Sequence, residues 1–425
     1  MPKCDAPHPR ANLPAVPGPI VIVGAGQAGL EVAESLRHEK YDGPIALLGA
    51  EAHIPYNRPP LSKKWLLERP NPASLYLRGA EVFERRKIEL QRGVTVTAID
   101  RAARQVHCAD GRRFSYGGLA LTTGAQLRTL PLPGVTLRGV FGLRTLDDAQ
   151  HIGAALDACV NAATPLVVIG GGFIGLEVAA TARKRGIVVT VLEGLDRLMS
   201  RVVAPIVSEA AAQLHRSHGV ELVFEARVVE LRGADGAVCA VRMADGHEYP
   251  AGCVVVGVGV NPEDALARAA GLECDRGIIV DDCARTSDPL IVAAGDCCAR
   301  RQADGTLLRL ESVQNAVEQG KSAAAALLGH ARPVAVAPWF WSDQYDARLQ
   351  MVGLSQGYDQ VVTRGKVAEF AFSAYYYRAG RLIAVDSLSR IQDHMTARRL
   401  LDRGLSPTPA QVADENFSLQ SLLAP

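Results

Sequence analysis

Long apolar runs and an excess of one charge are both missing from this 425-residue chain. Its most extended apolar stretches, residues 166–169 and 253–260, are much shorter than the roughly 18 residues of a membrane-spanning helix. Lysine and arginine together number 46 against 45 acidic residues, which leaves a net charge of +1. The sequence therefore predicts no membrane association and no partnership with nucleic acid.

Paired cysteine motifs are absent too, although the chain holds nine cysteines. No two of them have the C-x-x-C spacing of a redox or zinc motif, and an odd number does not complete a disulfide framework. We therefore expect a reducing, cytoplasmic location, and we predict no metal site. Residues 1–17 are rich in proline and lack the apolar core of a signal peptide, so we expect a disordered leader there.

What is present is an ordinary globular composition, with 48% hydrophobic and 21% charged residues. The length predicts two or three domains. Two segments, 20–38 and 166–185, repeat one pattern: a short β-branched run, a glycine-rich turn and helical apolar spacing. Each copy predicts the strand, tight turn and helix of an α/β domain.

The first glycine-rich turn has the sequence G-A-G-Q-A-G. Gly24 would make the turn, Gly26 would let a pyrophosphate approach the backbone, and Gly29 would let the helix pack on the strand. Free amides at the helix start then attract the anion. Glu51, after the next predicted strand at 45–48, would accept hydrogen bonds from a ribose. A glycine-rich turn without a ligand is the alternative.

The second turn, at residues 170–175, has the sequence G-G-G-F-I-G. The strand predicted at 188–192 ends at Glu193, whose carboxylate would bind a ribose diol and repel a 2′-phosphate. This favours NAD over NADP, although Arg197 lies four residues further on and could offset the preference. A solvent-exposed strand end is the alternative for Glu193. Two dinucleotide sites in one chain indicate hydride transfer from a nicotinamide to a flavin.

The fold class that follows is α/β, with two Rossmann-like dinucleotide-binding domains of the glutathione-reductase-like kind and a C-terminal α+β domain. We predict that residues 18–129 and 261–332 form a discontinuous FAD domain, and that residues 130–260 form an NAD domain inserted in it. Aromatic residues become frequent after about residue 333. A third domain, over 333–425, would cover the flavin.

Seven motifs in this chain together resemble those of the NADH-dependent, FAD-containing ferredoxin reductases that serve bacterial monooxygenases and dioxygenases. The resemblance covers about residues 18–410. The motifs are the first turn at 24–29, R-P-P-L-S-K at 58–63, L-T-T-G at 121–124, G-G-G-F-I-G-L-E at 170–177, G-D at 295–296, E-S-V at 311–313 and P-W-F-W-S-D-Q at 338–344.

This resemblance implies roles for individual residues. Asp296 would accept a hydrogen bond from the ribityl chain of the flavin, where a helix N-cap is the alternative. Lys63, with Glu177 as its ionic partner, would stabilise negative charge on the reduced flavin, where a solvated lysine is the alternative. Trp341 would lie near the path by which electrons leave, unless it is an ordinary strand residue. With the two turns, the FAD residues are Gly24, Gly26, Gln27, Ala28, Gly29, Glu51, Arg58, Lys63, Thr123, Gly124, Asp296, Val313 and Trp339; the NAD residues are Gly170, Gly172, Phe173, Ile174, Gly175, Glu193 and Gly259; the catalytic candidates are Lys63, Glu177 and Trp341.

No cysteine lies between residues 30 and 104, where related flavoenzymes carry a redox-active dithiol. Cys297 and Cys298 are the one close pair, either a strained redox bridge or two small buried residues. The flavin would therefore deliver electrons to an external acceptor, and the family implies a small, acidic, two-iron ferredoxin. Its docking would need basic residues. The candidates are Arg300, Arg301, Arg309, Arg398 and Arg399, of which Arg309 matches the family's docking position best.

The predicted function is electron transfer from NADH through FAD, one electron at a time, to a two-iron ferredoxin that feeds a cytochrome P450-type monooxygenase or a dioxygenase. A rubredoxin reductase and direct reduction of a small acceptor are alternatives within the enzyme class. From another class comes a redox sensor similar to apoptosis-inducing factor. Fast turnover without ferredoxin would indicate direct reduction, and slow flavin reduction with a change in oligomeric state would indicate the sensor.

Overall fold

The computed structural model describes residues 15, 16 and 18–424. The leader predicted over residues 1–17 therefore lies almost entirely outside the described residues. The chain divides into two compact units. Unit 1 comprises residues 1–57, 72–126 and 261–335, and unit 2 comprises residues 58–71, 127–260 and 336–425. The chain crosses between the units within β8 (Ala125–Leu127) and β17 (Val260–Pro262).

Unit 1 is built on a five-stranded parallel sheet with the strand order β19-β7-β1-β2-β3. Its strands are β1 (Ile20–Val23), β2 (Ile45–Gly49), β3 (Ile88–Arg92), β7 (Gly118–Leu121) and β19 (Ile291–Ala293). Every residue of β1 and β2 is buried. Strands buried on both faces are the pattern that a parallel sheet covered on both sides requires.

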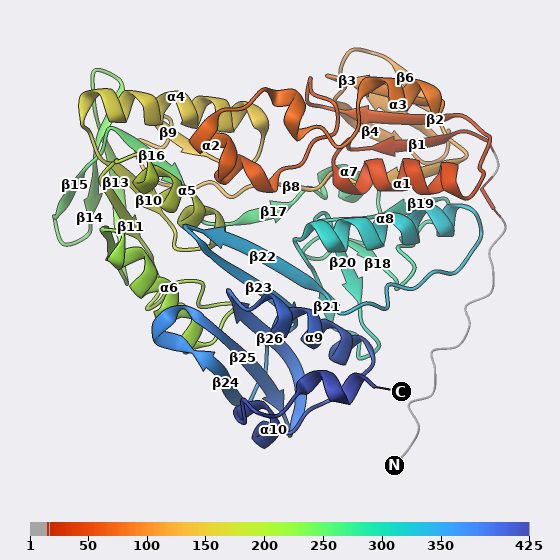
Figure 1. Ribbon diagram of the computed structural model, residues 1–425. Coiled ribbons are helices and arrows are strands. Elements are labelled where there is room, and N and C mark those ends of the chain that lie inside the picture. Colours follow the sequence, from red (N-terminus) through yellow and green to blue (C-terminus); the bar gives the residue numbers. More distant parts are fainter. Residues whose placement is uncertain (1–14, 17, 425) are drawn as a thin grey trace. The chain divides into compact units, whose positions relative to one another are not determined.

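The two faces of this sheet have different covers. Ile20 and Ile22 pack in a core with residues of α1 (Gln27–His38) and α8 (Val313–Leu327), which lie side by side (Figure 1). Val21 and Val23 alternate with them and pack in a second core with residues of the small sheets. Those sheets are made of β4 (Val96–Asp100), β5 (Gln105–Cys108) and β6 (Arg113–Ser115), and of β18 (Ile278–Val280), β20 (Cys298–Arg301) and β21 (Leu307–Leu308). Ala267 of α7 (Ala265–Ala269) packs in this second core, whereas Phe83 of α3 (Ala80–Arg85) packs in the first.

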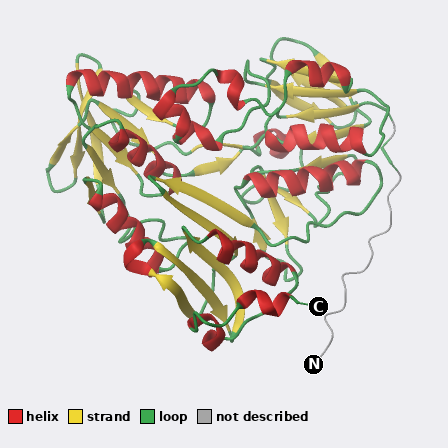
Figure 2. Cartoon of the chain, viewed as in Figure 1, coloured by secondary structure: helices red, strands yellow, loops and turns green. Residues whose placement is uncertain are grey.

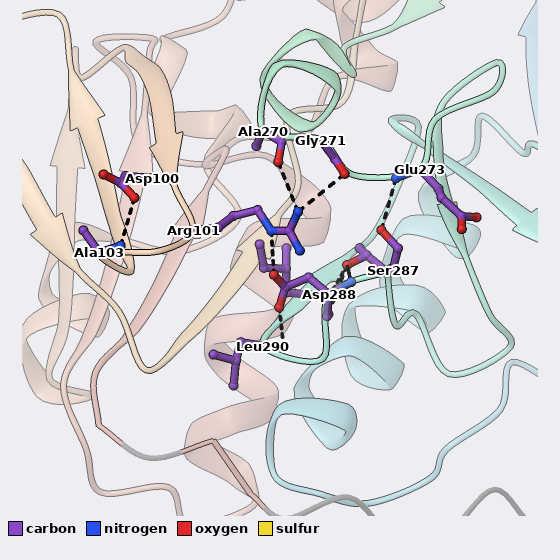
Figure 3. Close-up of polar contacts among 11 residues, drawn as sticks. Asp100, Arg101, Ala103, Ala270, Gly271, Glu273, Ser287, Asp288 and Leu290 are labelled. Carbon is purple, nitrogen blue, oxygen red and sulfur yellow. Dashed lines mark hydrogen bonds and ion pairs between the residues drawn. The ribbon is translucent and has the colours of Figure 1, made fainter.

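Segments of unit 1 that lie far apart in sequence are joined by Arg101, just after β4 (Figure 3). Its Nε donates to Asp288 Oδ2 at 2.7 Å, and its Nη1 donates to the carbonyl oxygen of Ala270 at 3.3 Å. Asp288 also accepts from the amide of Leu290 at 2.9 Å. One guanidinium therefore ties the 72–126 segment to the 261–335 segment, which supports a single discontinuous unit.

Unit 2 holds a second five-stranded parallel sheet, with the order β12-β11-β10-β16-β9. Its strands are β9 (Val140–Gly142), β10 (Leu166–Ile169), β11 (Val189–Leu192), β12 (Val220–Val223) and β16 (Cys253–Val256). The helices that accompany them are α4 (Leu146–Ala162), α5 (Phe173–Lys184) and α6 (Pro205–Ser217). A three-stranded antiparallel sheet follows, made of β13 (Val228–Ala234), β14 (Ala237–Met243) and β15 (Glu248–Pro250). The short helix α2 (Lys64–Glu68) also belongs to this unit.

The C-terminal part of unit 2 is an antiparallel sheet accompanied by helices (Figure 2). The strand order is β22-β23-β26-β25-β24, with bounds β22 (Trp339–Gln344), β23 (Ala347–Gly353), β24 (Gln360–Lys366), β25 (Ala371–Arg378) and β26 (Arg381–Leu388). Tyr376 packs in one core with residues of α5 and α6, whereas Tyr375 and Tyr377 pack in another with residues of α9 (Ile391–Asp402) and α10 (Pro409–Ala413). The aromatic run thus fills both faces of β25.

The α/β fold class with a C-terminal α+β part is confirmed by these sheets and by the comparisons reported below. The predicted division into FAD, NAD and C-terminal domains stays a prediction, since contacts group the chain into two units. Among the described residues, none of the helices combines the length and the apolar character needed to cross a membrane.

Candidate dinucleotide-binding sites

The first glycine-rich turn lies at the start of α1 in unit 1. Gly24 has a φ of +113°, and a Cβ atom there would lie 2.2 Å from the carbonyl oxygen of Thr122. A Cβ atom on Gly29 would lie 2.0 Å from the carbonyl oxygen of Gly24. A Cβ atom on Gly26, in contrast, would meet nothing within 4 Å. The outer two glycines are needed by the fold, whereas the middle one borders open space, as a bound pyrophosphate requires.

The start of α1 also offers backbone amides to an anion. Gly26 is the N-cap residue, and no side chain caps the helix. An α-helix has no carbonyl partner of its own for the amides of its first turn, here Gln27, Ala28 and Gly29. Free amide hydrogens beside open space fit the pyrophosphate of a dinucleotide, and its assignment to FAD stays a prediction.

Polar side chains stand just after the two strands that flank β1 in unit 1. Glu51, just after β2, accepts a hydrogen bond at Oε2 from the hydroxyl of Tyr56 at 2.5 Å. Thr123, just after β7, donates its hydroxyl hydrogen to the carbonyl oxygen of Glu263 at 2.5 Å. Gly124 follows with a φ of +76°. The structure thus places Glu51, Thr123 and Gly124 at the carboxyl edge of the sheet, where α/β folds bind nucleotides.

Asp296 follows β19 at the same edge and is supported by α8. The amide of the preceding Gly295 donates to Gln319 Oε1 at 2.8 Å, and Asn315 Nδ2 donates to the same oxygen at 3.3 Å. Both amide side chains are buried on α8, whose first residue is Val313. Sequence analysis missed Asn315 and Gln319, although two amides four residues apart in an alanine-rich segment were a usable signal.

In the second turn, which lies in unit 2, the outer glycines are again needed for close packing and the middle one borders open space. Gly170 has a φ of +108°, and a Cβ atom there would lie 2.5 Å from the carbonyl oxygen of Gly257. A Cβ atom on Gly175 would lie 2.3 Å from the carbonyl oxygen of Gly170. On Gly172, the N-cap of α5, a Cβ atom would meet only one atom, 4.0 Å away. This turn also fits a pyrophosphate.

Three further predicted NAD residues lie near the second turn. Phe173 opens α5 and packs on Phe340, with ring centroids 4.9 Å apart. Ile174 is 42% exposed, which is unusual for isoleucine and leaves its side chain open to a ligand. Gly259 has a φ of +100° and open space where a Cβ atom would stand. These positions leave room at the start of α5.

Glu193 directly follows β11 and holds the second turn in place. Its Oε2 accepts from the amide of Gly171 at 2.6 Å, and its Oε1 accepts from the amide of Leu195 at 2.8 Å. The side chain of Arg197 is engaged elsewhere, because it donates to the carbonyl oxygens of Val203 at 2.9 Å and Ser200 at 2.8 Å. The guanidinium group that could offset the preference for NAD is therefore already bonded to backbone carbonyl oxygens.

The structure brings Lys63 and Glu177 together in unit 2. Lys63 Nζ lies 2.9 Å from Glu177 Oε1, and the Lys63 side chain is 19% exposed. Ser62, the preceding residue, donates its hydroxyl hydrogen to Glu177 Oε2. Arg58, in the same segment, donates to the carbonyl oxygen of Arg144 at 2.7 Å. The ion pair exists as the resemblance implied, while its catalytic role stays a prediction.

Trp339 and Trp341 lie on β22 with ring centroids 5.4 Å apart. The guanidinium carbon of Arg398 lies 4.7 Å from the Trp339 ring centroid, a cation–π contact. The ring centroid of His394 lies 6.0 Å from that of Trp339. Burial lowers the pKa of His394 to about 4, so it is neutral near pH 7. Arg398 thus carries the positive charge beside the two tryptophans.

The five basic docking candidates differ in how much of their charge is free. Arg309 pairs with Glu311 at 2.6 Å and is only 24% exposed, and Arg301 pairs with Glu273 at 3.2 Å. Arg300 donates to the carbonyl oxygen of Val334 at 2.9 Å. Within the part of the chain that is described, neither Arg398 nor Arg399 has an ion pair, which makes these two the stronger docking candidates. The described residues also contain no cluster of metal-binding side chains.

Two parallel sheets, each with a glycine-rich turn open to a pyrophosphate, define an oxidoreductase that binds two dinucleotides. Comparison with protein families agrees. The profile of the pyridine nucleotide-disulphide oxidoreductases matches residues 18–320, and a reductase C-terminal profile matches residues 339–423. The chain belongs to the pyridine nucleotide-disulphide oxidoreductase family, and this membership implies FAD and NAD(H) as cofactors.

Individual relatives extend over nearly the whole chain. Rhodocoxin reductase from Rhodococcus erythropolis is 44% identical over 406 residues, covering 95% of this chain and 94% of the relative. A solved structure of the ferredoxin reductase for the CYP199A2 system from Rhodopseudomonas palustris matches with a TM-score of 0.93 at 44% identity, covering 96% of this chain and all of the other. The covalent putidaredoxin reductase–putidaredoxin complex matches with a TM-score of 0.91 at 40% identity, covering 97% and 99%. The resemblance found in the motifs is confirmed.

Proposed function

We propose that this chain is an NADH-dependent ferredoxin reductase, which passes electrons from NADH through FAD, one at a time, to a two-iron ferredoxin. The ferredoxin would feed an oxygenase, either a cytochrome P450-type monooxygenase or a dioxygenase. The observation that carries the proposal is the pair of open glycine-rich helix starts, at 24–29 and 170–175, in a chain without a cysteine between residues 30 and 104. The relatives named as ferredoxin reductases support the same acceptor.

FAD and NADH, when bound, supply hydride transfer and the release of single electrons, and the chain supplies binding, orientation and charge. Amides at the starts of α1 and α5 would hold the two pyrophosphates. Asp296 and Glu51 would accept hydrogen bonds from hydroxyl groups of FAD, and Glu193 would accept them from the ribose of NADH. Lys63, held by Glu177, would stabilise negative charge on the reduced flavin.

The buried cysteine pair supports an acceptor outside the chain. The Sγ atoms of Cys297 and Cys298 lie 3.7 Å apart, and the two residues are 0% and 1% exposed. Burial raises the pKa of Cys298 well above its ordinary value, while the hydrogen bond from Cys298 lowers the pKa of Cys297. Thiols closed off from solvent do not exchange with a soluble disulfide. Their position favours packing over a redox relay.

The exposed face of α9 is the docking surface that we propose for the ferredoxin. Ile391 and Met395 are 54% and 44% exposed and lie one turn apart. Arg398 and Arg399 continue the same face one turn further on, because residues three and four apart are neighbours on a helix. Apolar side chains beside unpaired positive charge suit a small acidic protein.

We also propose a cytoplasmic location. Eight cysteines lie among the described residues, and all eight are free thiols. Free thiols in this number are typical of reducing compartments.

The test is NADH-driven reduction of cytochrome c by the purified holoenzyme, with and without a purified two-iron ferredoxin, and repeated with NADPH. A large increase in rate only when ferredoxin is present, with NADH preferred, is the expected result. A fast rate without ferredoxin would replace the proposal with direct reduction of a small acceptor. Flavin reduction too slow for turnover would replace it with redox sensing.

A further inference from the structure

Four polar side chains of unit 2 form one continuous chain of hydrogen bonds that ends at Glu177, which in turn pairs with Lys63. His215 Nε2 lies 2.9 Å from Gln344 Oε1, and Gln344 Nε2 lies 3.2 Å from Ser342 Oγ. Ser342 Oγ lies 2.6 Å from Glu177 Oε1, the oxygen that also receives Lys63 Nζ. The members come from α6, β22 and α5, and from the segment before α2.

These groups are shielded from water. His215 and Ser342 are 0% exposed, Glu177 is 4% exposed and Gln344 is 5% exposed. A small cavity borders Ser342 and Gln344, and its other lining residues, among them Met199 and Leu349, are all apolar. A polar atom left without its partner here would find no other hydrogen-bonding group. The hydrogen bonds of this network therefore depend on one another.

Every donor in this chain of hydrogen bonds points toward Glu177. A carbonyl oxygen only accepts, so His215 Nε2 must carry the hydrogen that reaches Gln344 Oε1. The amide nitrogen of Gln344 then donates to Ser342, whose own hydroxyl hydrogen is left for the carboxylate. Burial lowers the pKa of His215 to about 4, which keeps the ring neutral near pH 7. The ring is also held by Tyr345, at a centroid distance of 5.2 Å.

The carboxylate is fixed from the other side by the segment that carries Lys63. Ser62 donates to Glu177 Oε2, and the carbonyl oxygen of Ser62 accepts from Thr181 Oγ1 at 3.0 Å. Both oxygens of Glu177 are therefore used, one by Ser62 and the other by Ser342 and Lys63. The position of Oε1, and with it the position of the lysine ammonium group, depends on Ser342.

We infer that Ser342, Gln344 and His215 are positioning residues, which act through Glu177 to hold the Lys63 ammonium group at one place. The inference rests on the proposed function, in which that positive charge stabilises the reduced flavin. Ser342 and Gln344 alternate along β22 with Trp339 and Trp341, so one face of this strand holds the ion pair and the other face carries the tryptophans. None of the three positioning residues had been singled out in the sequence, although the first two lie in the W-F-W-S-D-Q motif.

The test compares Ser342→Ala with Ser342→Thr in the oxidised holoenzyme. Threonine keeps the hydroxyl, and Ser342 borders the small cavity toward which an added methyl group can be accommodated only by local adjustment. The matched control is Ser387→Ala, which removes another fully buried serine hydroxyl in the same sheet. Ser387 accepts a hydrogen bond of 3.0 Å from Ser373 and takes no part in the hydrogen bonds that lead to Glu177. Gln344→Met is a second variant that removes the donor to Ser342 while keeping the length of the side chain.

The first readout is the rate at which sulfosuccinimidyl acetate acetylates Lys63, measured by mass spectrometry of the peptide. Ser342→Ala is expected to raise this rate at least threefold and Gln344→Met to raise it less, whereas Ser342→Thr and Ser387→Ala stay near wild type. Wild-type rates in both Ser342→Ala and Gln344→Met would overturn the inference. If Ser342→Ala does not retain FAD, Gln344→Met decides the question by itself.

The second readout is the midpoint potential of the flavin, which a merely structural role would leave unchanged. Ser342→Ala is expected to make it more negative, because the positive charge is no longer fixed, and Ser342→Thr is expected to restore it. An unchanged potential in Ser342→Ala would overturn the electrostatic role. Neither readout needs an electron acceptor, so a failure of the proposed function would appear separately, as wild-type turnover that ferredoxin does not increase.

Discussion

The carboxylate of Glu193 accepts a hydrogen bond of 2.6 Å from the backbone amide of Gly171, inside the second glycine-rich turn. The end of β11 and the turn before α5 are thereby tied together at the edge where a ribose would sit. A carboxylate at this edge accepts hydrogen bonds from the 2′- and 3′-hydroxyl groups and repels a 2′-phosphate. Arg197, the residue that would oppose this preference, donates to Ser200 and Val203 instead.

Glu193→Ala is expected to lower kcat/KM for NADH by roughly tenfold to a hundredfold, because hydrogen bonds to a charged group contribute about 1.5–3 kcal/mol. The rate with NADPH should fall less, so the ratio of the two kcat/KM values shrinks. Steady-state kinetics with both nucleotides measures it. Arg197→Ala is the control and should leave the NADPH rate unchanged. A loss of NADPH activity in Arg197→Ala would show that this arginine binds the 2′-phosphate after all.

Gly172→Ala and Gly175→Ala separate ligand binding from packing in the second turn. The first adds a methyl group to open space, so the variant should keep wild-type stability and FAD content while its KM for NADH rises about tenfold or more. The second puts a Cβ atom 2.3 Å from the carbonyl oxygen of Gly170 and should lower the free energy of unfolding by roughly 3 kcal/mol. Kinetics together with thermal unfolding distinguishes the two. Equal destabilisation by both substitutions would contradict this division.

Local sequence was sufficient to find both turns, because the strand, the glycines and the helix that build each of them are contiguous. It was not sufficient for the surroundings of Glu177. Ser342 lies 165 positions further along the chain, and only the packing of β22 against α5 brings the two side chains together. The sequence also does not reveal which acidic residue pairs with a given arginine when several candidates exist. Arg309 was favoured for docking by resemblance, yet Glu311 two residues on neutralises part of its charge.

Arg399→Glu tests the docking surface on α9. A charge reversal there should raise the KM for an acidic ferredoxin about tenfold at low ionic strength, and the effect should shrink as salt screens the charges. Ferricyanide reduction, which needs no protein partner, serves as the internal control. Arg232→Glu makes the same charge change at another half-exposed arginine of unit 2 and should leave the ferredoxin KM unchanged. If both reversals raise the KM equally, the effect comes from net charge and not from α9.

Asp386 gives the protein a pH dependence whose sign follows from its burial. The residue is 3% exposed, and burial raises the pKa of its carboxyl group to about 7, although the hydroxyl donated by Tyr376 acts in the opposite direction. The folded pKa therefore lies above the value of about 3.8 in the unfolded chain. As the pH rises between these two values, the unfolded chain releases the proton while the folded protein keeps it, so stability falls.

Asp386→Asn removes this titration but keeps an oxygen that accepts from Tyr376. Between pH 5 and pH 8 the wild type should lose about 3 kcal/mol of unfolding free energy that the variant does not lose. The interval from pH 5 to the folded pKa spans about two pH units, and each pH unit contributes about 1.4 kcal/mol. Unfolding of both proteins at the two pH values measures the difference, in which all other titrating groups cancel. Asp346→Asn, at a fully exposed side chain, is the control and should follow the wild type. A gap between Asp386→Asn and wild type that is the same at both pH values would mean that Asp386 titrates near its ordinary pKa in the folded protein.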